Sequence, residues 1–350
     1  MRLLIDIGHP AHVHLFRNAI HRWQERGHNV VITARDKDLT TTLLDRYQFP
    51  YILVSRARTG TRGLAIEYLQ HSVGVLKAAL QHCSQLLLGT SVSIGPVARL
   101  TGARAIVFNE DDANVVRAFS FLAYKLAHLI VTPTCLNENY GSRHVKYPGY
   151  QKLAYLHPNV FTPNRGILTK LNIEDNEPYF IVRLVSLQAA HDRGEKGIEY
   201  KRQLRLINFL SRNGRVFVTS EGPLTEELEP YRIRIAPELI HDAIAFAKMV
   251  VSDSQTMTAE AAILGVPAIR CNTFVGRISY LEELEHRYQL TFGFQPKDEE
   301  FLFKFMSDLL AEPNLTVIWQ QRRQKMLSEK IDVTAWMVDM VERYAEELKR

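Results

Sequence analysis

The sequence predicts an α/β protein made of two doubly wound domains. Short apolar strands alternate with amphipathic helices along most of the chain, which indicates parallel sheets covered by helices on both faces. The alternation stops once, in the proline-containing stretch at residues 157–178, and then starts again. The length of 350 residues also favours two domains.

The first domain is expected at residues 1–160. Gly27 follows its first predicted helix, at a position where glycine commonly ends a helix. The predicted strands are 3–7, 29–34, 51–54, 85–88, 105–108 and 129–132, and the predicted helices are 13–26, 39–47, 64–82 and 114–127.

The second domain is expected at residues 161–331. Its predicted strands are 179–185, 215–219, 249–252 and 268–270, and its predicted helices are 197–211, 238–247, 259–264, 301–310 and 317–329. Asp332 is suited to cap a last helix, and we expect the segment 332–350 to pack back on the first domain. Because doubly wound sheets bind ligands at the carboxyl ends of their strands, we expect the two domains to face a central cleft.

Composition limits the classes of partner and compartment. The 43 Lys and Arg residues against 38 Asp and Glu suit anionic ligands, but they are spread out, so we do not expect nucleic acid. Three widely spaced cysteines argue against a disulfide framework and a cysteine zinc site. No signal peptide or spanning segment is predicted, because Asp6 interrupts the first apolar run and no run reaches about 18 residues. We expect a cytoplasmic protein that could lie peripherally at the inner face of a membrane.

The segment from residue 249 to residue 270 carries the strongest site signal. A buried strand ends in a polar turn, and a helix starts at Ser254, Gln255 and Thr256, where unpaired N–H groups can hold a phosphate. Glu260 lacks a Ser or Thr three residues earlier, so it has no capping-box role and could bind two ribose hydroxyls. The alternative is an ordinary strand–helix turn with a surface glutamate. Arg270, at the end of the next strand, is a further candidate for the ligand site.

The loop after the first strand is a second candidate site. Gly8 allows close approach of the backbone to a ligand, and His9, His12 and His14 follow it. His12 and His14 cannot share one helix face, so a two-histidine metal site is not expected. A histidine here could act as a base or bind phosphate, and His12 is the leading candidate base. The alternative for each is a capping or solvated histidine.

Two charged loops extend these candidates. Glu110 and Asp111 follow a buried strand, so one of them could be a general base at the rim of the cleft; the alternative is a solvated acidic turn that caps the next helix.

Arg56, Arg58 and Arg62 lie in a basic loop of the first domain. This loop could receive an anionic or lipid-phosphate group; the alternative is a solvated loop.

The segment 252–267 resembles the Ser-Asp-Ser…Glu-Ala…Leu-Gly-x-Pro signature of UDP-N-acetylglucosamine 2-epimerases and related GT-B transferases. In those proteins the serine meets the diphosphate and the glutamate holds the uridine ribose, which implies these roles for Ser254 and Glu260. Two departures stand out. Gln255 and Thr256 replace a pair of glycines, and Gly89-Thr90-Ser91 lacks the acid of the epimerase Gly-Asp-Thr, which counts against epimerase chemistry.

The opening loop is similar to that of the peptidoglycan GlcNAc transferase. Together, the runs 5–14, 33–38 and 252–267 look like an uncharacterised bacterial and archaeal family grouped with GT-B glycosyltransferases, over most of the chain. The resemblance implies two Rossmann-like domains. It also implies that Arg183, His191 and Arg193, which flank the first strand of the second domain, face the diphosphate of a bound donor; the alternative is a solvated charged loop.

On this basis we expect a glycosyltransferase that takes a sugar from a UDP-sugar, with no metal and no cofactor. The second domain would hold the donor, and the first would hold a glycan or lipid-linked acceptor at the membrane surface. A UDP-N-acetylglucosamine 2-epimerase-like isomerase and a non-catalytic nucleotide-sugar-binding protein are the alternatives. A homodimer is left open.

Overall fold

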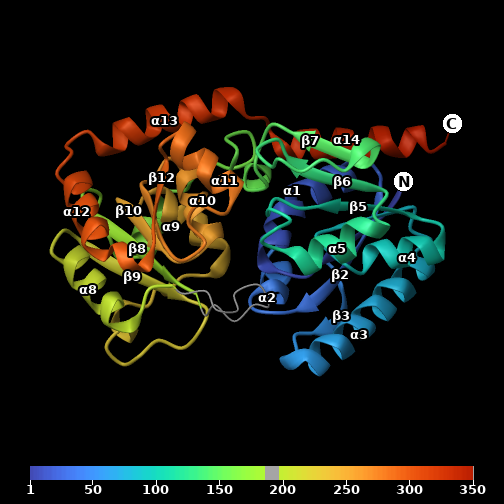
Figure 1. Cartoon of the computed structure of the whole chain (residues 1–350), viewed down its shortest axis with the longest axis horizontal. Helices are drawn as coiled ribbons and strands as arrows, with labels where there is room; N and C mark the ends of the chain where they lie inside the picture. Colours follow the sequence, from blue (N-terminus) through green and yellow to red (C-terminus); the bar gives the residue numbers. More distant parts are fainter. Residues whose placement is uncertain (186–196, 350) are drawn as a thin grey trace. The chain divides into compact units, whose positions relative to one another are not determined.

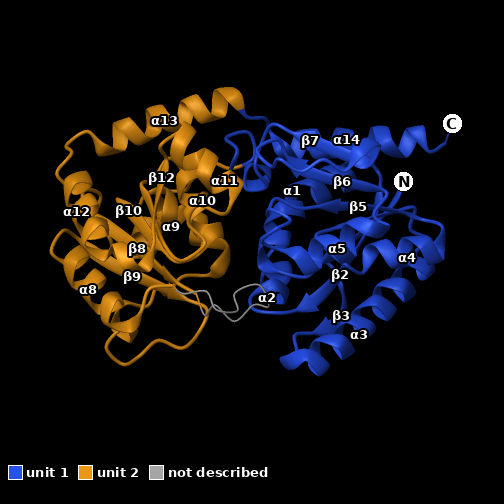
Figure 2. Ribbon diagram, viewed as in Figure 1, with its two compact units in different colours: residues 1–160, 330–350 blue, residues 161–329 orange. Residues whose placement is uncertain are grey.

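The computed structural model describes residues 1–185 and 197–349 (Figure 1). They form two compact units (Figure 2). Unit 1 contains residues 1–160 and 330–350, and unit 2 contains residues 161–329. Both units are α/β, each with its own parallel sheet.

Unit 1 is built on a seven-stranded parallel sheet in the order β3-β2-β1-β4-β5-β6-β7. The strand order therefore reverses between β1 and β4, and doubly wound sheets bind ligands beyond the carboxyl ends of the strands at such a reversal. The strands are β1 (Arg2–Ile7), β2 (Asn29–Asp36), β3 (Ile52–Arg56), β4 (Leu86–Gly89), β5 (Arg104–Phe108), β6 (Leu129–Pro133) and β7 (His144–Tyr147).

The helices of unit 1 cover both faces of this sheet, and the last of them comes from the end of the chain. That helix, α14, contacts α1 and α6, and Thr334 donates a hydrogen bond to the carbonyl of Ala154 at 2.6 Å. The helices are α1 (Pro10–Glu25), α2 (Thr40–Arg46), α3 (Gly60–Gln81), α4 (Ile94–Thr101), α5 (Arg117–Leu126), α6 (Leu153–Leu156) and α14 (Val333–Glu347), with a 3-10 turn at Gly141–Arg143.

Unit 2 is built on a five-stranded parallel sheet in the order β12-β11-β10-β8-β9, which reverses between β8 and β10. Its strands are β8 (Tyr179–Leu184), β9 (Arg215–Ser220), β10 (Met249–Ser252), β11 (Ala268–Cys271) and β12 (Thr291–Phe294). Its α-helices are α7 (Gly166–Lys170), α8 (Tyr200–Ser211), α9 (Ile240–Ala245), α10 (Gln255–Leu264), α11 (Ser279–Glu282), α12 (Glu299–Leu310) and α13 (Leu315–Glu329). Short 3-10 turns lie at Glu229–Tyr231, Pro237–Leu239 and Pro296–Asp298, and one π turn lies at Glu283–Arg287.

The helices of unit 2 are sorted between the two faces of the sheet. Side chains of α8 and α12 share one apolar core with β8, β9 and β10. On the other face, α10 packs against α9 and α13. All of α10 from Met257 to Leu264 is buried, whereas Gln255 and Thr256 in its first turn are partly exposed. The one accessible part of this helix is therefore its amino-terminal end.

Three elements of unit 1 were not predicted, one of which is the four-residue helix α6. Helix α4 was not predicted, because Gly95 and Pro96 interrupt the helical pattern; the proline is tolerated because it lies in the first turn. Strand β7 was not predicted either, since it is a short edge strand that mixes polar and apolar residues. In unit 2, α10 begins four residues earlier than the predicted helix 259–264.

Candidate functional site

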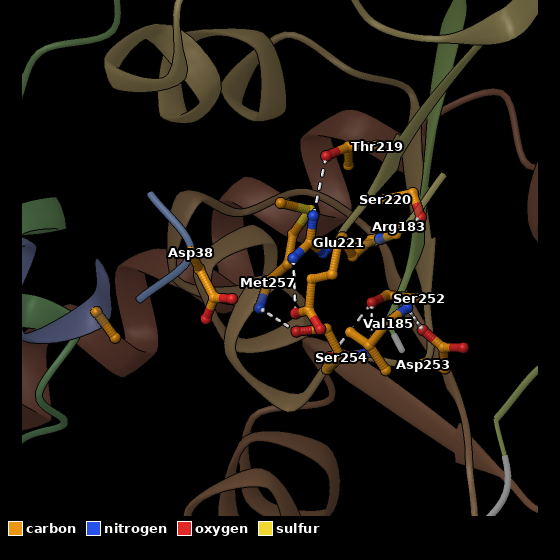
Figure 3. A network of polar contacts seen from close by, with 12 residues as sticks. Asp38, Arg183, Val185, Thr219, Ser220, Glu221, Ser252, Asp253, Ser254 and Met257 are labelled. Atoms are coloured by element: carbon orange, nitrogen blue, oxygen red, sulfur yellow. Dashed lines mark hydrogen bonds and ion pairs between the residues drawn. The ribbon is translucent and has the colours of Figure 1, made fainter. Parts of the chain in front are cut away.

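The start of α10 is the best-organised polar site of unit 2 (Figure 3). Ser254 has an extended backbone and caps the helix, since its Oγ accepts a hydrogen bond from the N–H of Met257 at 3.4 Å. Ser252 Oγ accepts from the N–H of Ser254 at 2.7 Å, which fixes the turn. Thr258 Oγ1 donates to the carbonyl of Ser254 at 2.6 Å, so this hydroxyl is used inside the helix and does not face a ligand.

Within residues 1–185 and 197–349, the N–H groups of Gln255 and Thr256 have no hydrogen-bond partner. A helix has no acceptors for the N–H groups of its first turn, and its amino-terminal end carries a partial positive charge. Here that end follows β10, next to β8, where the strand order of unit 2 reverses. The structure thus places Ser254, Gln255 and Thr256 together in a position suited to an anion.

Asp253 connects this turn to neighbouring segments. Its Oδ1 accepts from the N–H of Val185 at 2.8 Å, and its Oδ2 accepts from the N–H of Ile198 at 3.3 Å. Burial raises the pKa of Asp253 to about 7, although the two backbone N–H groups act in the opposite direction. Asp253 was not predicted as a site residue; its place in the Ser-Asp-Ser run was the available signal.

Arg183 lies at the carboxyl end of β8, opposite Ser252 in the sheet register. Its guanidinium donates to Thr219 Oγ1 at 3.1 Å and to Glu221 Oε1 at 2.8 Å (Figure 3). Arg183 therefore lies at the same edge of the sheet as the start of α10, as the prediction requires. The carboxylate of Glu221 offsets part of its positive charge. The other two predicted cations, His191 and Arg193, lie outside the described residues.

Glu260 lies one turn and a half into α10 and is buried. Its Oε1 is 3.1 Å from Nε2 of His241, which is also buried, on α9. The alternative of a surface glutamate is therefore wrong. His241 was not predicted, and nothing in its local sequence sets it apart from a core histidine.

Arg270 is completely buried, with 0% of its side chain exposed. It forms an ion pair with Glu282 at 3.2 Å, which ties β11 to α11. Burial lowers the pKa of Arg270, and the charge of Glu282 opposes that shift. Protein encloses its guanidinium in this structure, and the direct contact of Arg270 with a ligand stays a prediction.

The predicted histidine loop of unit 1 lies where the strand order of its sheet reverses, after β1. His9 is the N-cap of α1, and its Nδ1 accepts from the N–H of Ala11 at 3.2 Å, so the capping alternative is correct for His9. His14 is buried against the rings of Tyr47 and Tyr155. Gly8 has open space where a side chain would point.

His12 is partly buried and uncharged at neutral pH. Burial lowers its pKa to about 4; Lys37 and Arg35 act in the same direction, and Asp6 opposes them. The N–H of Gly8 donates to Nδ1 of His12 at 3.4 Å, so the proton of the neutral ring resides on Nε2. This tautomer makes Nε2 a hydrogen-bond donor, and action as a base at Nε2 would require the other tautomer.

A buried polar network beside this loop was not predicted. Nε2 of His71 lies 2.9 Å from both carboxylate oxygens of Asp6, and Nδ1 lies 2.7 Å from Ser55 Oγ. Burial alone would raise the pKa of Asp6, but the charge and hydrogen bond of His71 outweigh it and leave this pKa below its usual value. For His71, burial acts downward, yet Asp6 raises its pKa overall. Each partner therefore favours the charged form of the other.

Glu110 is buried rather than exposed at a rim. Its Oε2 accepts from the N–H of Gln151 at 2.8 Å, and its Oε1 pairs with the ammonium of Lys152. The prediction of Glu110 as an accessible base is therefore wrong, because its charge is committed to a buried ion pair. Asp111 is partly exposed, and α5 has Val116 as its N-cap, so the capping alternative is wrong as well.

Comparison with solved structures identifies the fold. The chain is similar to the UDP-GlcNAc 2-epimerase from Neisseria meningitidis bound to UDP-GlcNAc, with a TM-score of 0.64 at 10% identity over 98% of this chain and 100% of the other. It is also similar to the Streptomyces sp. SF2575 glycosyltransferase SsfS6 complexed with thymidine diphosphate, with a TM-score of 0.62 at 13% identity over 98% and 99% of the two chains. The fold is thus the GT-B type, as predicted.

Sequence comparison gives the family. An uncharacterised protein of Methanocaldococcus jannaschii is 25% identical over 281 residues, which cover 76% of this chain and 80% of the relative. The profile described as "Protein of unknown function (DUF354)" matches residues 1–346. Since that match spans almost the whole sequence, the chain belongs to the DUF354 family.

Proposed function

We propose that this protein is a glycosyltransferase that uses a UDP-sugar as its donor and needs no metal ion. The observation that carries the proposal is the first turn of α10, the accessible end of an otherwise buried helix at the strand reversal of unit 2. The N–H groups of Gln255 and Thr256 would hold the diphosphate, together with Ser254. The helix end and Arg183 would offset its charge in place of a divalent cation.

Glu260 would bind the ribose of the donor. A carboxylate can accept hydrogen bonds from both vicinal hydroxyls, and a buried carboxylate discriminates strongly against a ligand that cannot pair with it. His241, at 3.1 Å from Oε1, would act as a positioning residue that fixes the carboxylate. The bound nucleotides of the two structural relatives support a nucleotide site in this fold.

Unit 1 would hold the acceptor. In the transfer step, an acceptor hydroxyl attacks the anomeric carbon, the bond from that carbon to the diphosphate oxygen breaks, and UDP leaves. The hydroxyl proton must pass to a base, and His12 and Asp111 are the candidates at the carboxyl edge of this sheet. Replacing His12 by Ala and by Gln distinguishes a catalytic base from a hydrogen-bond donor. Loss of sugar transfer in both variants indicates that His12 is the base. Transfer that is retained in His12→Gln indicates that the ring only donates a hydrogen bond, which the Gln amide can also do.

Donor binding can be tested first, without an acceptor. A thermal-shift titration with UDP, UDP-GlcNAc and thymidine diphosphate should raise the melting temperature, since ligand binding stabilises by RT ln(1 + [L]/Kd). Glu260→Gln should weaken the shift, and the exposed Glu174→Gln on the same unit is the matched control. A wild-type protein that none of these nucleotides stabilises would contradict the proposal. Transfer that EDTA abolishes and a divalent ion restores would contradict the metal-free scheme.

An epimerase is the second candidate, favoured by the similarity to the Neisseria enzyme. Incubation with UDP-GlcNAc alone distinguishes the two, because an epimerase changes the sugar without an acceptor. The loop after β4 argues against it: this loop offers Thr90 and Ser91, and Thr90 Oγ1 already donates to the carbonyl of Phe108 at 2.7 Å. A third outcome is that nucleotides bind but neither sugar transfer nor epimerisation occurs. If His12→Ala also leaves the cellular function unchanged, the protein is a non-catalytic nucleotide-sugar-binding protein.

A further inference from the structure

Helix α3 of unit 1 buries two ionisable side chains and exposes several large apolar ones. Its inward face carries Glu67 and His71, both buried. Glu67 accepts from the N–H of Arg58 at 2.8 Å and pairs with Arg35, and His71 pairs with Asp6. These polar contacts attach the first half of the helix to the sheet, and Val75, Ala78 and Ala79 pack its second half into the apolar core.

The outward face of α3 is correspondingly apolar. Ile66, Leu69, Val73 and Leu80 follow one another at intervals of three, four and seven residues, so they line one side of the helix. All four are exposed, and Leu69 reaches 63%. Large apolar side chains are also exposed on the two neighbouring helices: Leu100 on α4, and Phe121 and Leu122 on α5.

These three helices form one continuous layer. α4 packs against both α3 and α5, and all three contribute to the same apolar core over the sheet (Figure 1). We call the exposed side chains of this layer the α3–α5 surface. An exposed apolar area that extends over several helices generally marks a site of interaction with a partner or a membrane.

The charges of the α3–α5 surface have one sign. Among the residues of α3, α4 and α5, the only acidic one is Glu67, and it is buried. The exposed charged side chains are all cationic: Arg62, Lys77, Arg99, Arg117 and Lys125. Two copies of this surface in contact would bring cations against cations, which disfavours a symmetric dimer.

We propose that the α3–α5 surface binds the anionic surface of a lipid bilayer. Leucine, valine and phenylalanine side chains would enter the boundary between headgroups and acyl chains, while the lysines and arginines would pair with lipid phosphates. The helices would lie on the membrane and not cross it; within the described residues, no helix is long and apolar enough to span a bilayer. The inference does not depend on the proposed function, since it uses no residue of the nucleotide site.

Vesicle co-sedimentation of the full chain tests the proposal. The wild-type protein should sediment with vesicles of phosphatidylcholine and phosphatidylglycerol, and much less with phosphatidylcholine alone. The double variant Leu69→Gln with Phe121→Gln should reduce the partition coefficient at least about tenfold, because it removes two large apolar groups. Replacing Lys77 and Lys125 by Gln should cause a loss of roughly tenfold or more on anionic vesicles.

Unit 2 offers a matched control for the apolar variant. Phe301 is 71% exposed against 70% for Phe121, and Val317 is 56% exposed against 63% for Leu69. The double variant Phe301→Gln with Val317→Gln should leave vesicle binding unchanged. Circular dichroism melting curves of both double variants should match the wild type, since the replaced side chains are exposed.

Three outcomes would overturn the inference. The wild-type protein could fail to bind anionic vesicles, or the control variant could lose as much binding as the α3–α5 variant. Alternatively, light scattering could show a wild-type oligomer that the Leu69→Gln, Phe121→Gln variant dissociates, without vesicle binding. That last result would assign the surface to a second copy of the chain.

Discussion

Asp253 is the buried acid whose ionisation should be visible in stability measurements. Its carboxylate holds the N–H groups of Val185 and Ile198, and burial raises its pKa to about 7. In the unfolded chain this pKa returns to about 4. Between these values the folded state binds the proton more tightly, so raising the pH through this range should lower the free energy of unfolding.

We expect this loss to reach at most about 1.4 kcal/mol per pH unit between pH 4 and pH 7. Urea denaturation of the wild type and of Asp253→Asn over this range would measure it. The variant cannot titrate at this position, so the difference between the two proteins should change with pH in the stated direction. If the difference in free energy of unfolding between the two proteins does not change with pH, Asp253 does not have a raised pKa in the folded state.

Substitution by alanine should lower the free energy of unfolding at one glycine, Gly197, and leave it nearly unchanged at another, Gly8. A Cβ at Gly197 would collide with the carboxylate of Asp253, whereas a Cβ at Gly8 would meet no atom within 4 Å. We therefore expect Gly197→Ala to lower the free energy of unfolding by roughly 1–3 kcal/mol. Gly8→Ala should change it by less than about 0.5 kcal/mol.

Gly8→Ala should nevertheless impair function, because the new Cβ would enter the open space through which a ligand is expected to approach the backbone. The measurement is urea denaturation together with the activity found for the wild type. Equal activity of Gly8→Ala and wild type would show that no ligand approaches this loop closely.

At the scale of elements, the cap of α10 allows stability and ligand binding to be separated. Ser254→Ala removes the hydrogen bond to the N–H of Met257 and should cost about 1 kcal/mol. Ser254→Asp restores a capping oxygen and should recover most of this loss. Its negative charge would repel a diphosphate, so the thermal shift caused by UDP should be lost in Ser254→Asp. A UDP shift that survives in this stable variant would place the nucleotide elsewhere.

The strand–turn–helix elements were the most predictable part of the fold and of the site. The continuous apolar strand before Ser254 and the polar turn after it are local signals, and the structure has β10 and the start of α10 there. The partners of buried charges were not predictable. Glu110 pairs with Lys152, and Asp6 with His71 on a helix 65 residues further along the chain. Only the folded sheet brings these side chains together.

At the scale of the whole molecule, unit 1 depends on α14. Val333, Met337, Val338 and Val341 on this helix are buried against unit 1. Each buried side chain contributes roughly 1.5–3 kcal/mol, and a domain has only about 5–15 kcal/mol of net stability. Ending the chain at Glu329 should therefore unfold unit 1 and leave unit 2 folded.

Hydrogen exchange measured by mass spectrometry, read separately for β1–β7 and β8–β12, would show this. A chain ending at Glu347 is the matched control, because it keeps α14, and it should exchange like the full chain. Protection that persists in β1–β7 after truncation at Glu329 would show that unit 1 folds without α14.

The return of α14 to unit 1 also has a consequence for protein synthesis. Strands β1–β7 are translated before unit 2, whereas the helix that completes their covering is translated after it. Unit 2 is one uninterrupted stretch of chain and can close as soon as α13 has emerged. The usual order, in which the amino-terminal domain folds first, is therefore reversed. Until α14 has been translated, the nascent first half lacks the helix that covers α1 and α6, so it stays incompletely covered while the second half can already fold.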